Sequence, residues 1–159
     1  MASKITASTL TVSLTEAINL NGQDMGATNT KNISSVKEVS KRIITVTTAE
    51  SVIATFSAAV ASAGHYVAAN VRYIRFTNLD DTNFITLTFR NQDNDEVAIK
   101  LDAEQSFTWN GDNTNGMTAV FNATQDADAA SSANLGSLTN IQADADTASC
   151  DLEMFVASI

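Results

Sequence analysis

The sequence predicts an all-β protein, an antiparallel β-sandwich of jelly-roll-like or Greek-key type with an extended N-terminal segment. Eight or more short runs alternate apolar with polar residues, at spacings of about ten residues. Asn- and Asp-rich turns separate many of these runs. No long run has the period of a convincing helix, so a sandwich is favoured over a barrel or an α/β fold.

The N-terminal part begins with a strand and continues into a polar stretch. Residues 5–14 alternate Leu10, Val12 and Leu14 with threonine and serine, which is typical of a strand with one face on a core. Asn21-Gly22 and Gly26 mark residues 21–32 as a loop or an extended arm rather than a packed element. We expect residues 1–35 to form an extended arm or a loop-rich contact with a partner.

The remaining chain supplies the other expected strands. Residues 41–47 are rich in β-branched side chains, which fit a pleated surface. Residues 49–63 are ambiguous, because their alanines permit a helix, and a short strand followed by a loop of small residues is preferred. Residues 67–77, 84–90 and 97–101 are expected to form a meander joined by Asn/Asp-rich turns. Further strands are expected at 106–110, 117–123, 138–143 and 149–157, with a loop at 111–116 and a weakly hydrophobic stretch at 124–134.

Length and composition indicate one folded domain, residues 1–159. The 159 residues are 44% hydrophobic and 17% charged, which is ordinary for a globular protein. The net charge of −9 argues against a nucleic-acid partner. The sequence has no apolar run of about 18 residues, so we expect a soluble protein without a membrane partner. Basic residues do cluster locally, as solvated strand faces or as a contact with an acidic neighbour: Lys37, Lys41, Arg42, Arg72 and Arg75.

The sequence offers no constellation for catalysis, so we expect a protein that is not an enzyme. His65 is the only histidine, and no nucleophile motif accompanies it, which favours a loop or interface residue. Cys150 is the only cysteine, and its place in an apolar alternation predicts a small buried side chain. One histidine and one cysteine cannot hold zinc, and the six glycines are too dispersed for a phosphate loop. No cofactor, metal site or catalytic residue is therefore expected.

Two weaker possibilities remain open. Three groups of acidic residues offer oxygen ligands that suit calcium, although solvated turns are the favoured interpretation: Asp93 to Glu96, Asp126 with Asp128, and Asp144 with Asp146. Aromatic side chains could form a sugar-stacking platform, although core or subunit-interface packing is favoured for them: Tyr66, Tyr73 and Trp109.

The sequence lacks proline, which is unusual for a β protein. Proline in an exposed edge strand commonly prevents that strand from pairing with another chain. We therefore hypothesise that a neighbouring subunit protects the sheet edges, which makes a homo-oligomer the expected state.

Several of these strands resemble segments of small virion structural proteins of tailed bacteriophages, especially marine ones. The resemblance is carried by residues 71–87 (Val71 to Leu87), 97–101, 105–107 and 152–158, and it covers about half of the chain. It implies a protein made in the host cytoplasm and incorporated into the virion, as a capsid decoration or cement protein bound to the major capsid protein or to other virion subunits. A tail or neck component and a carbohydrate-binding or adhesin module are the alternatives.

Overall fold

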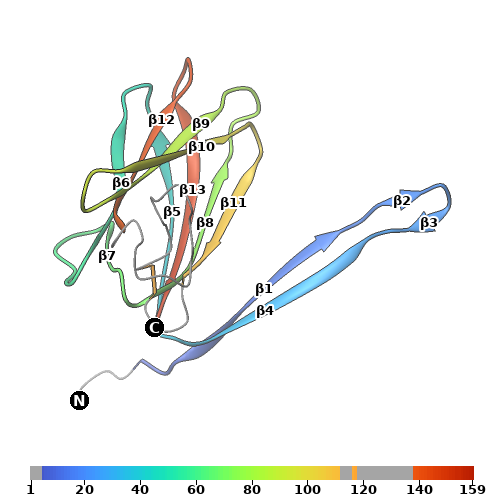
Figure 1. Cartoon of the computed structure of the whole chain (residues 1–159), viewed down its shortest axis with the longest axis horizontal. Helices are drawn as coiled ribbons and strands as arrows, with labels where there is room; N and C mark the ends of the chain where they lie inside the picture. Colours follow the sequence, from blue (N-terminus) through green and yellow to red (C-terminus); the bar gives the residue numbers. More distant parts are fainter. Residues whose placement is uncertain (1–4, 112–115, 118–137) are drawn as a thin grey trace.

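The computed structural model describes residues 5–111, 116–117 and 138–159, and it confirms an all-β sandwich with an extended N-terminal segment (Figure 1). Within these residues one sheet has the strand order β10-β9-β12-β6-β7 and the other has the order β11-β8-β13-β5. The first sheet consists of β6 (Ser51–Ser57), β7 (His65–Val67), β9 (Ile85–Asn91), β10 (Glu96–Leu101) and β12 (Leu138–Ala145). The second consists of β5 (Glu38–Val46), β8 (Val71–Asn78), β11 (Ser106–Asn110) and β13 (Cys150–Ser158).

The core lies between the two sheets and follows the alternation of the sequence. In β13 the side chains of Leu152, Met154 and Val156 are buried, while the intervening residues are more exposed. Phe89 of β9 is the aromatic centre of this core. Its ring contacts rings of the opposite sheet at centroid distances of 6.5 Å to Phe76, 5.7 Å to Phe107 and 5.3 Å to Trp109. Such edge-to-face contacts hold the sheets together beyond simple burial of area.

The expected meander is wrong at its first connection. Strands β8 and β9 do not pair, because the chain crosses from one sheet to the other between them, whereas β9 and β10 do form a hairpin. The Asn78 amide holds this crossover by donating to the carbonyls of Asn83 (2.8 Å) and Leu101 (3.2 Å). Backbone N–H groups of Asn83 and Thr82 donate to the Asp80 carboxylate and lower its pKa. Alternation shows which face of a strand is buried, and a crossover leaves that pattern unchanged.

The segment 49–63, which the sequence left ambiguous, forms the preferred short strand followed by a loop. Residues 51–57 form β6, and a loop of small residues follows before β7. The expected strand at 67–77 is interrupted, because residues 65–67 form β7 and the next strand starts only at Val71. Strand β5 begins at Glu38, three residues before its expected start. Met117 is buried in the core, and the rest of the expected strand 117–123 lies outside the described residues, as does the stretch 124–134.

The N-terminal segment is a long hairpin, which we call the arm (Ser8–Val36). Strand β1 (Ser8–Glu16) pairs with β4 (Ala27–Val36), and the short strands β2 (Asn19–Leu20) and β3 (Gln23–Asp24) continue the ribbon to its tip. Figure 1 shows the arm leaving the sandwich near the C-terminus and extending far beyond it. Of the two alternatives for residues 21–32, the loop is wrong, since these residues turn and return as β3 and β4, whereas the extended arm is confirmed.

The turn at the tip of the arm is determined by two adjacent residues, Asn21 and Gly22. Asn21 and Gly22 both have positive φ, +52° and +81°, as a two-residue turn of type I′ requires. Asparagine and glycine are the residues that adopt this conformation at the lowest cost. The Asn-Gly pair therefore fixes the register of β2 on β3, and with it the hairpin.

A small second core anchors the base of the arm to the outer face of the β8–β13 sheet. Ile33 and Val36 of the arm are buried there with Tyr73 and Ala157, while Leu10 and Val12 pack against them partly exposed. The backbone N–H of Lys37 donates to the Ser158 carbonyl at 2.9 Å. The arm thus leaves the sandwich from a packed and hydrogen-bonded base.

The ribbon carries a β-bulge at this base. Its register shifts between Ser8, which faces Val36, and Leu10, which faces Ile33, so the strand β4 holds one extra residue. Ser35 within the bulge has φ +63°, a left-handed conformation that is unfavourable for residues with a Cβ.

Ser35→Gly is expected to raise the free energy of unfolding by up to about 1 kcal/mol, because glycine adopts positive φ without steric cost. Chemical denaturation of the two proteins measures this difference. Ser34→Gly is the matched control, since Ser34 is not among the positive-φ residues and its replacement should be neutral or destabilising. A loss of stability in Ser35→Gly would contradict the strained bulge.

Candidate interaction surface

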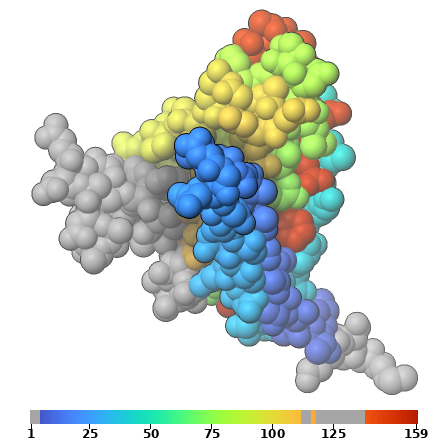
Figure 2. All heavy atoms as spheres, turned by 90° about the vertical axis from the view of Figure 1, so that its right-hand side faces the viewer, coloured from blue at the N-terminus to red at the C-terminus, as the bar shows by residue number. Residues whose placement is uncertain are grey.

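The most unusual surface of the described chain is the apolar side of the arm. Four large side chains there are mostly exposed, at 61% for Leu14, 55% for Ile18, 58% for Leu20 and 63% for Met25. We call these four residues the apolar tip. Figure 2 shows the arm standing in front of the sandwich as a separate ridge. Exposed apolar side chains that gather on one projecting element make it a candidate interaction surface.

The two faces of the arm differ in character. The register places Leu10, Val12 and Leu14 on one face of β1, and this face continues outward from the packed base. The other face carries only hydroxyl and amide groups along the middle of the ribbon. They bond in cross-strand pairs, Thr11 to Asn32 at 3.0 Å, and Ser13 with Thr30 and Thr15 with Thr28 at 3.3 Å and 3.2 Å. The arm is therefore amphipathic. One face is polar with its side chains hydrogen-bonded, and the other carries most of the exposed apolar side chains, interrupted by Glu16, Asn29 and Lys31.

The outer face of the β5–β13–β8 sheet holds a small network of charges. Lys41 Nζ lies 2.9 Å from Glu153 Oε2, and Arg75 contacts Oε1 of the same carboxylate. Hydrogen bonds from Lys41 and Arg75 lower the pKa of Glu153. Lys41 and Arg75, two of the five basic residues that cluster in the sequence, here meet an acidic group of the chain itself.

Replacing Glu153 with glutamine is expected to cost about 1 kcal/mol of stability at pH 7. The carboxylate pKa is lower in the folded protein than in the unfolded chain. Its contribution is therefore complete above the ordinary glutamate pKa and disappears as the pH falls through the lowered value. Urea denaturation of both proteins at pH 7 and at pH 3 should show a smaller difference in the free energy of unfolding at pH 3 than at pH 7. An equal difference at the two pH values would contradict the network.

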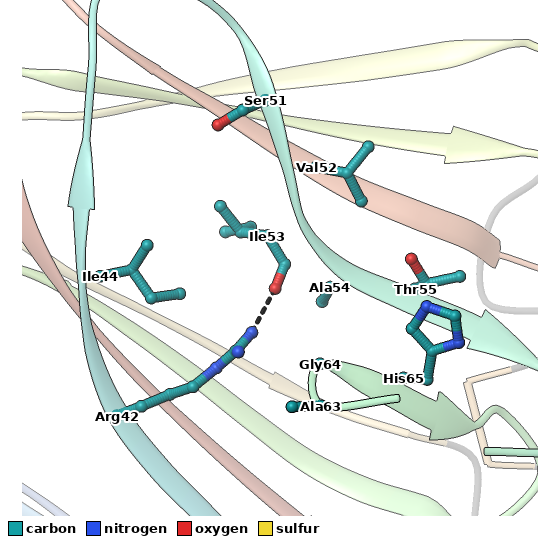
Figure 3. Close-up of a pocket in the computed structure, with 10 residues that line it drawn as sticks. All are labelled: Arg42, Ile44, Ser51, Val52, Ile53, Ala54, Thr55, Ala63, Gly64 and His65. Atoms are coloured by element: carbon teal, nitrogen blue, oxygen red, sulfur yellow. Dashed lines mark hydrogen bonds between the residues drawn. The ribbon is translucent and has the colours of Figure 1, made fainter. Parts of the chain in front are cut away.

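A cleft lies at an open edge of the sandwich, between β5 and the β6–β7 pair (Figure 3). Its volume is about 370 Å³, and Arg42 and His65 are the basic residues among those that line it. The Arg42 guanidinium donates through Nη2 to the Ile53 carbonyl. His65 belongs to strand β7 and pairs with Thr55, so the loop alternative is wrong, and its role at an interface stays a prediction.

The other residues that the sequence singled out lie elsewhere. Cys150 is buried in the core, as predicted, and burial raises the pKa of its thiol. In the 93–96 turn, the Asn91 side chain accepts from the backbone N–H of Asp93 and Asp95, and Glu96 pairs with Arg90. Residues 126–128 lie outside the described part. Within the described ranges no three His, Cys, Asp or Glu side chains gather as a metal site would require.

The three aromatic residues do not form one platform. Trp109 packs partly buried against the core, beside Phe89. Tyr73 lies in the second core on the opposite face of the same sheet, and Tyr66 is buried in β7 of the other sheet. The sugar-stacking arrangement of Tyr66, Tyr73 and Trp109 is therefore absent from the described structure.

Comparisons with protein-family models, curated proteins and solved structures gave no match. In the part of the chain that the structure describes, there is no helix of the length and apolar character that a membrane span needs.

Proposed function

We propose that this chain is a structural protein of a bacteriophage virion, of the capsid decoration or cement type, that attaches through its arm. The observation that carries the proposal is the uncovered apolar face of the arm. A two-stranded ribbon is only marginally stable alone in water, and its exposed apolar side chains gain free energy only when a partner covers them. The virion assignment itself is supported by the resemblance of residues 71–87, 97–101, 105–107 and 152–158 to phage virion proteins.

A rigid sandwich with a projecting arm suits a protein that bridges neighbouring subunits. The sandwich has its own core, so the arm can cross a boundary between major capsid subunits without carrying the fold. Its main-chain edges can pair with a strand of the partner, while the apolar tip fills a pocket there. Many such contacts would stabilise a shell by buried area, without chemistry.

Two other functions compete with this one. A tail or neck component would use the same arm in a ring of few copies, and the geometry of the arm suits it equally well. A carbohydrate-binding or adhesin module has less support, because Trp109 is packed against the core rather than presented on a surface.

Copy number in purified virions tests the proposal. Quantitative mass spectrometry of particles of the phage that encodes the chain should find it in hundreds of copies, comparable to the major capsid protein. A count of around a dozen or fewer would assign it to the tail or neck instead. Absence from the particles would overturn the virion role altogether.

A further inference from the structure

The cleft between β5 and the β6–β7 pair contains a cation that has no anionic partner in the described chain. Of the four arginines, Arg75 and Arg90 form ion pairs with carboxylates, whereas no ion pair joins Arg42 or Arg72 to a described residue. Arg72 instead donates to the carbonyls of Ala69 and Val71. Arg42 is half-buried at the cleft, where its one hydrogen bond to a described residue goes to a neutral carbonyl. In a chain of net charge −9, an unpaired arginine in a cleft is an unusual feature.

Arg42 also leaves a hydrogen-bonding group unsatisfied. Its Nε is buried and has no acceptor in the described structure. A buried N–H without a partner is costly, and native proteins rarely retain one without a reason. A planar acceptor that bridges Nε and one Nη would satisfy it once the side chain moves enough to expose Nε, and a carboxylate is the group with that geometry.

The main chain around the guanidinium is arranged to make room for it. Gly64 has φ +85°, and a Cβ at this position would lie 3.0 Å from Nη2 and 3.2 Å from Nη1 of Arg42. The turn that contains Gly64 is held in place, because the N–H of Thr55 donates to the Gly64 carbonyl at 2.8 Å. Figure 3 shows the guanidinium lying between β5 and β6, above this turn. The cleft is therefore built around the arginine.

The cleft as a whole suits a single negative charge. Ser51, Thr55 and His65 add polar side chains elsewhere along it, and none of the described residues that line it is Asp or Glu. One guanidinium matches a monoanion better than a dianion, since the chain as a whole repels added negative charge. From these observations we infer that the cleft is a binding site for a carboxylate group, with Arg42 as its charged anchor. This inference does not depend on the virion role.

The carboxylate can come from two sources, a free small molecule or an acidic side chain of a partner. The full chain is titrated with sodium acetate, and separately with a blocked Ala-Glu-Ala peptide, at an ionic strength held constant with sodium chloride. The Nε–Hε signal of Arg42 in ¹⁵N NMR spectra reports binding. We expect a saturable shift of this signal with both probes. Tighter binding of the peptide would identify a partner side chain as the source, and tighter binding of acetate a small molecule.

Variants separate the arginine from general charge effects. Arg42→Gln removes the positive charge. Arg42→Lys keeps the charge but removes the planar guanidinium group, which can donate two parallel hydrogen bonds to a carboxylate. Both should weaken acetate binding by about tenfold or more, followed through the backbone amides of Gly64 and His65. Arg90→Gln is the control, because Arg90 already has the carboxylate of Glu96 and its loss should leave acetate binding unchanged.

The unmodified protein alone can overturn the inference, so a variant that fails to fold does not decide the matter. Absence of a saturable shift with both acetate and peptide would contradict a carboxylate site. A shift produced equally by chloride would mean that the cleft has no preference for carboxylates. Binding of inorganic phosphate without binding of acetate would also overturn the assignment.

Discussion

A variant with Leu14, Ile18, Leu20 and Met25 all replaced by threonine is expected to lose binding to the virion while its sandwich stays folded. Each side chain is more than half exposed in the free protein, so the substitutions remove little packing. In the docked state each would bury its apolar surface, worth about 1 kcal/mol or more per residue. The combined loss of about 4 kcal/mol corresponds to roughly a thousandfold weaker binding. Co-sedimentation of the purified variant with particles that lack the protein measures this effect.

The matched control changes exposed apolar residues of the sandwich. Val60 and Leu79 are 57% and 47% exposed, and their replacement by threonine should leave particle binding unchanged. Deletion of residues 1–32 should also abolish binding, although it uncovers Tyr73 and Phe155 at the base of the arm. If the quadruple variant bound as tightly as the original chain, the apolar tip would not be the docking surface.

Replacing Phe89 with alanine is expected to lower the free energy of unfolding by about 3–5 kcal/mol. Phe89 is 1% exposed and joins the sheets through its contacts with Phe76, Phe107 and Trp109. Its removal forfeits the transfer free energy of the ring and leaves a cavity that these neighbours cannot fill without moving. For a chain of this size the midpoint of thermal unfolding, Tm, should fall by roughly 10 °C. Calorimetry or urea denaturation checks both quantities.

Phe84→Ala is the control for this change, because it removes the same atoms from a partly exposed site. Phe84 contacts Lys100, whose Nζ lies 4.6 Å from the ring centroid. Its loss should cost about 1 kcal/mol. Equal costs for the two substitutions would show that Phe89 is not the centre of the core.

The core strands could be predicted from the sequence because their burial is one-sided. In β9 and β13 the apolar residues recur at every second position, and this period identifies both the strand and its inward face. The same pattern placed Cys150 correctly in the core. Pairing was not predictable in this way, since β8 and β9 carry the same alternation whether they pair or face one another across the core. The crossover held by Asn78 depends on carbonyls distant in the sequence, such as that of Leu101.

The hairpin of the arm was missed for a physical reason. Strand β4 is exposed along most of its length, so threonine, asparagine and serine on both of its faces leave no period in hydrophobicity. Two signals could have revealed it. The Asn21-Gly22 pair is a strong hairpin turn signal, and Ile18, Leu20 and Met25 are large apolar residues in an otherwise polar stretch. Their exposure, and hence the candidate interaction surface, appears only when the ribbon projects from the sandwich.

The Arg42 cleft could not be predicted from the sequence, for a different reason. Nothing in the order of residues indicates that the Arg42 guanidinium meets the Ile53 carbonyl and the Gly64 turn, because these three positions lie on separate strands and loops. The local cluster of Lys37, Lys41 and Arg42 was interpreted as solvated strand faces or as a contact with an acidic neighbour. Lys41 instead pairs with Glu153 on the outer face of the sheet, whereas Arg42 lies in the cleft at its edge.

Hydrogen exchange of the arm, compared between the free and the particle-bound protein, tests the central claim most directly. We expect peptides from the part of residues 8–36 beyond the packed base to exchange rapidly in the free protein, because this part of the ribbon stands apart from the sandwich, and to become strongly protected on the particle. Peptides from the core strands β9 and β13 should be protected equally in both states. Unchanged exchange of residues 8–36 on binding, with new protection confined to the sandwich, would contradict the arm as the docking element.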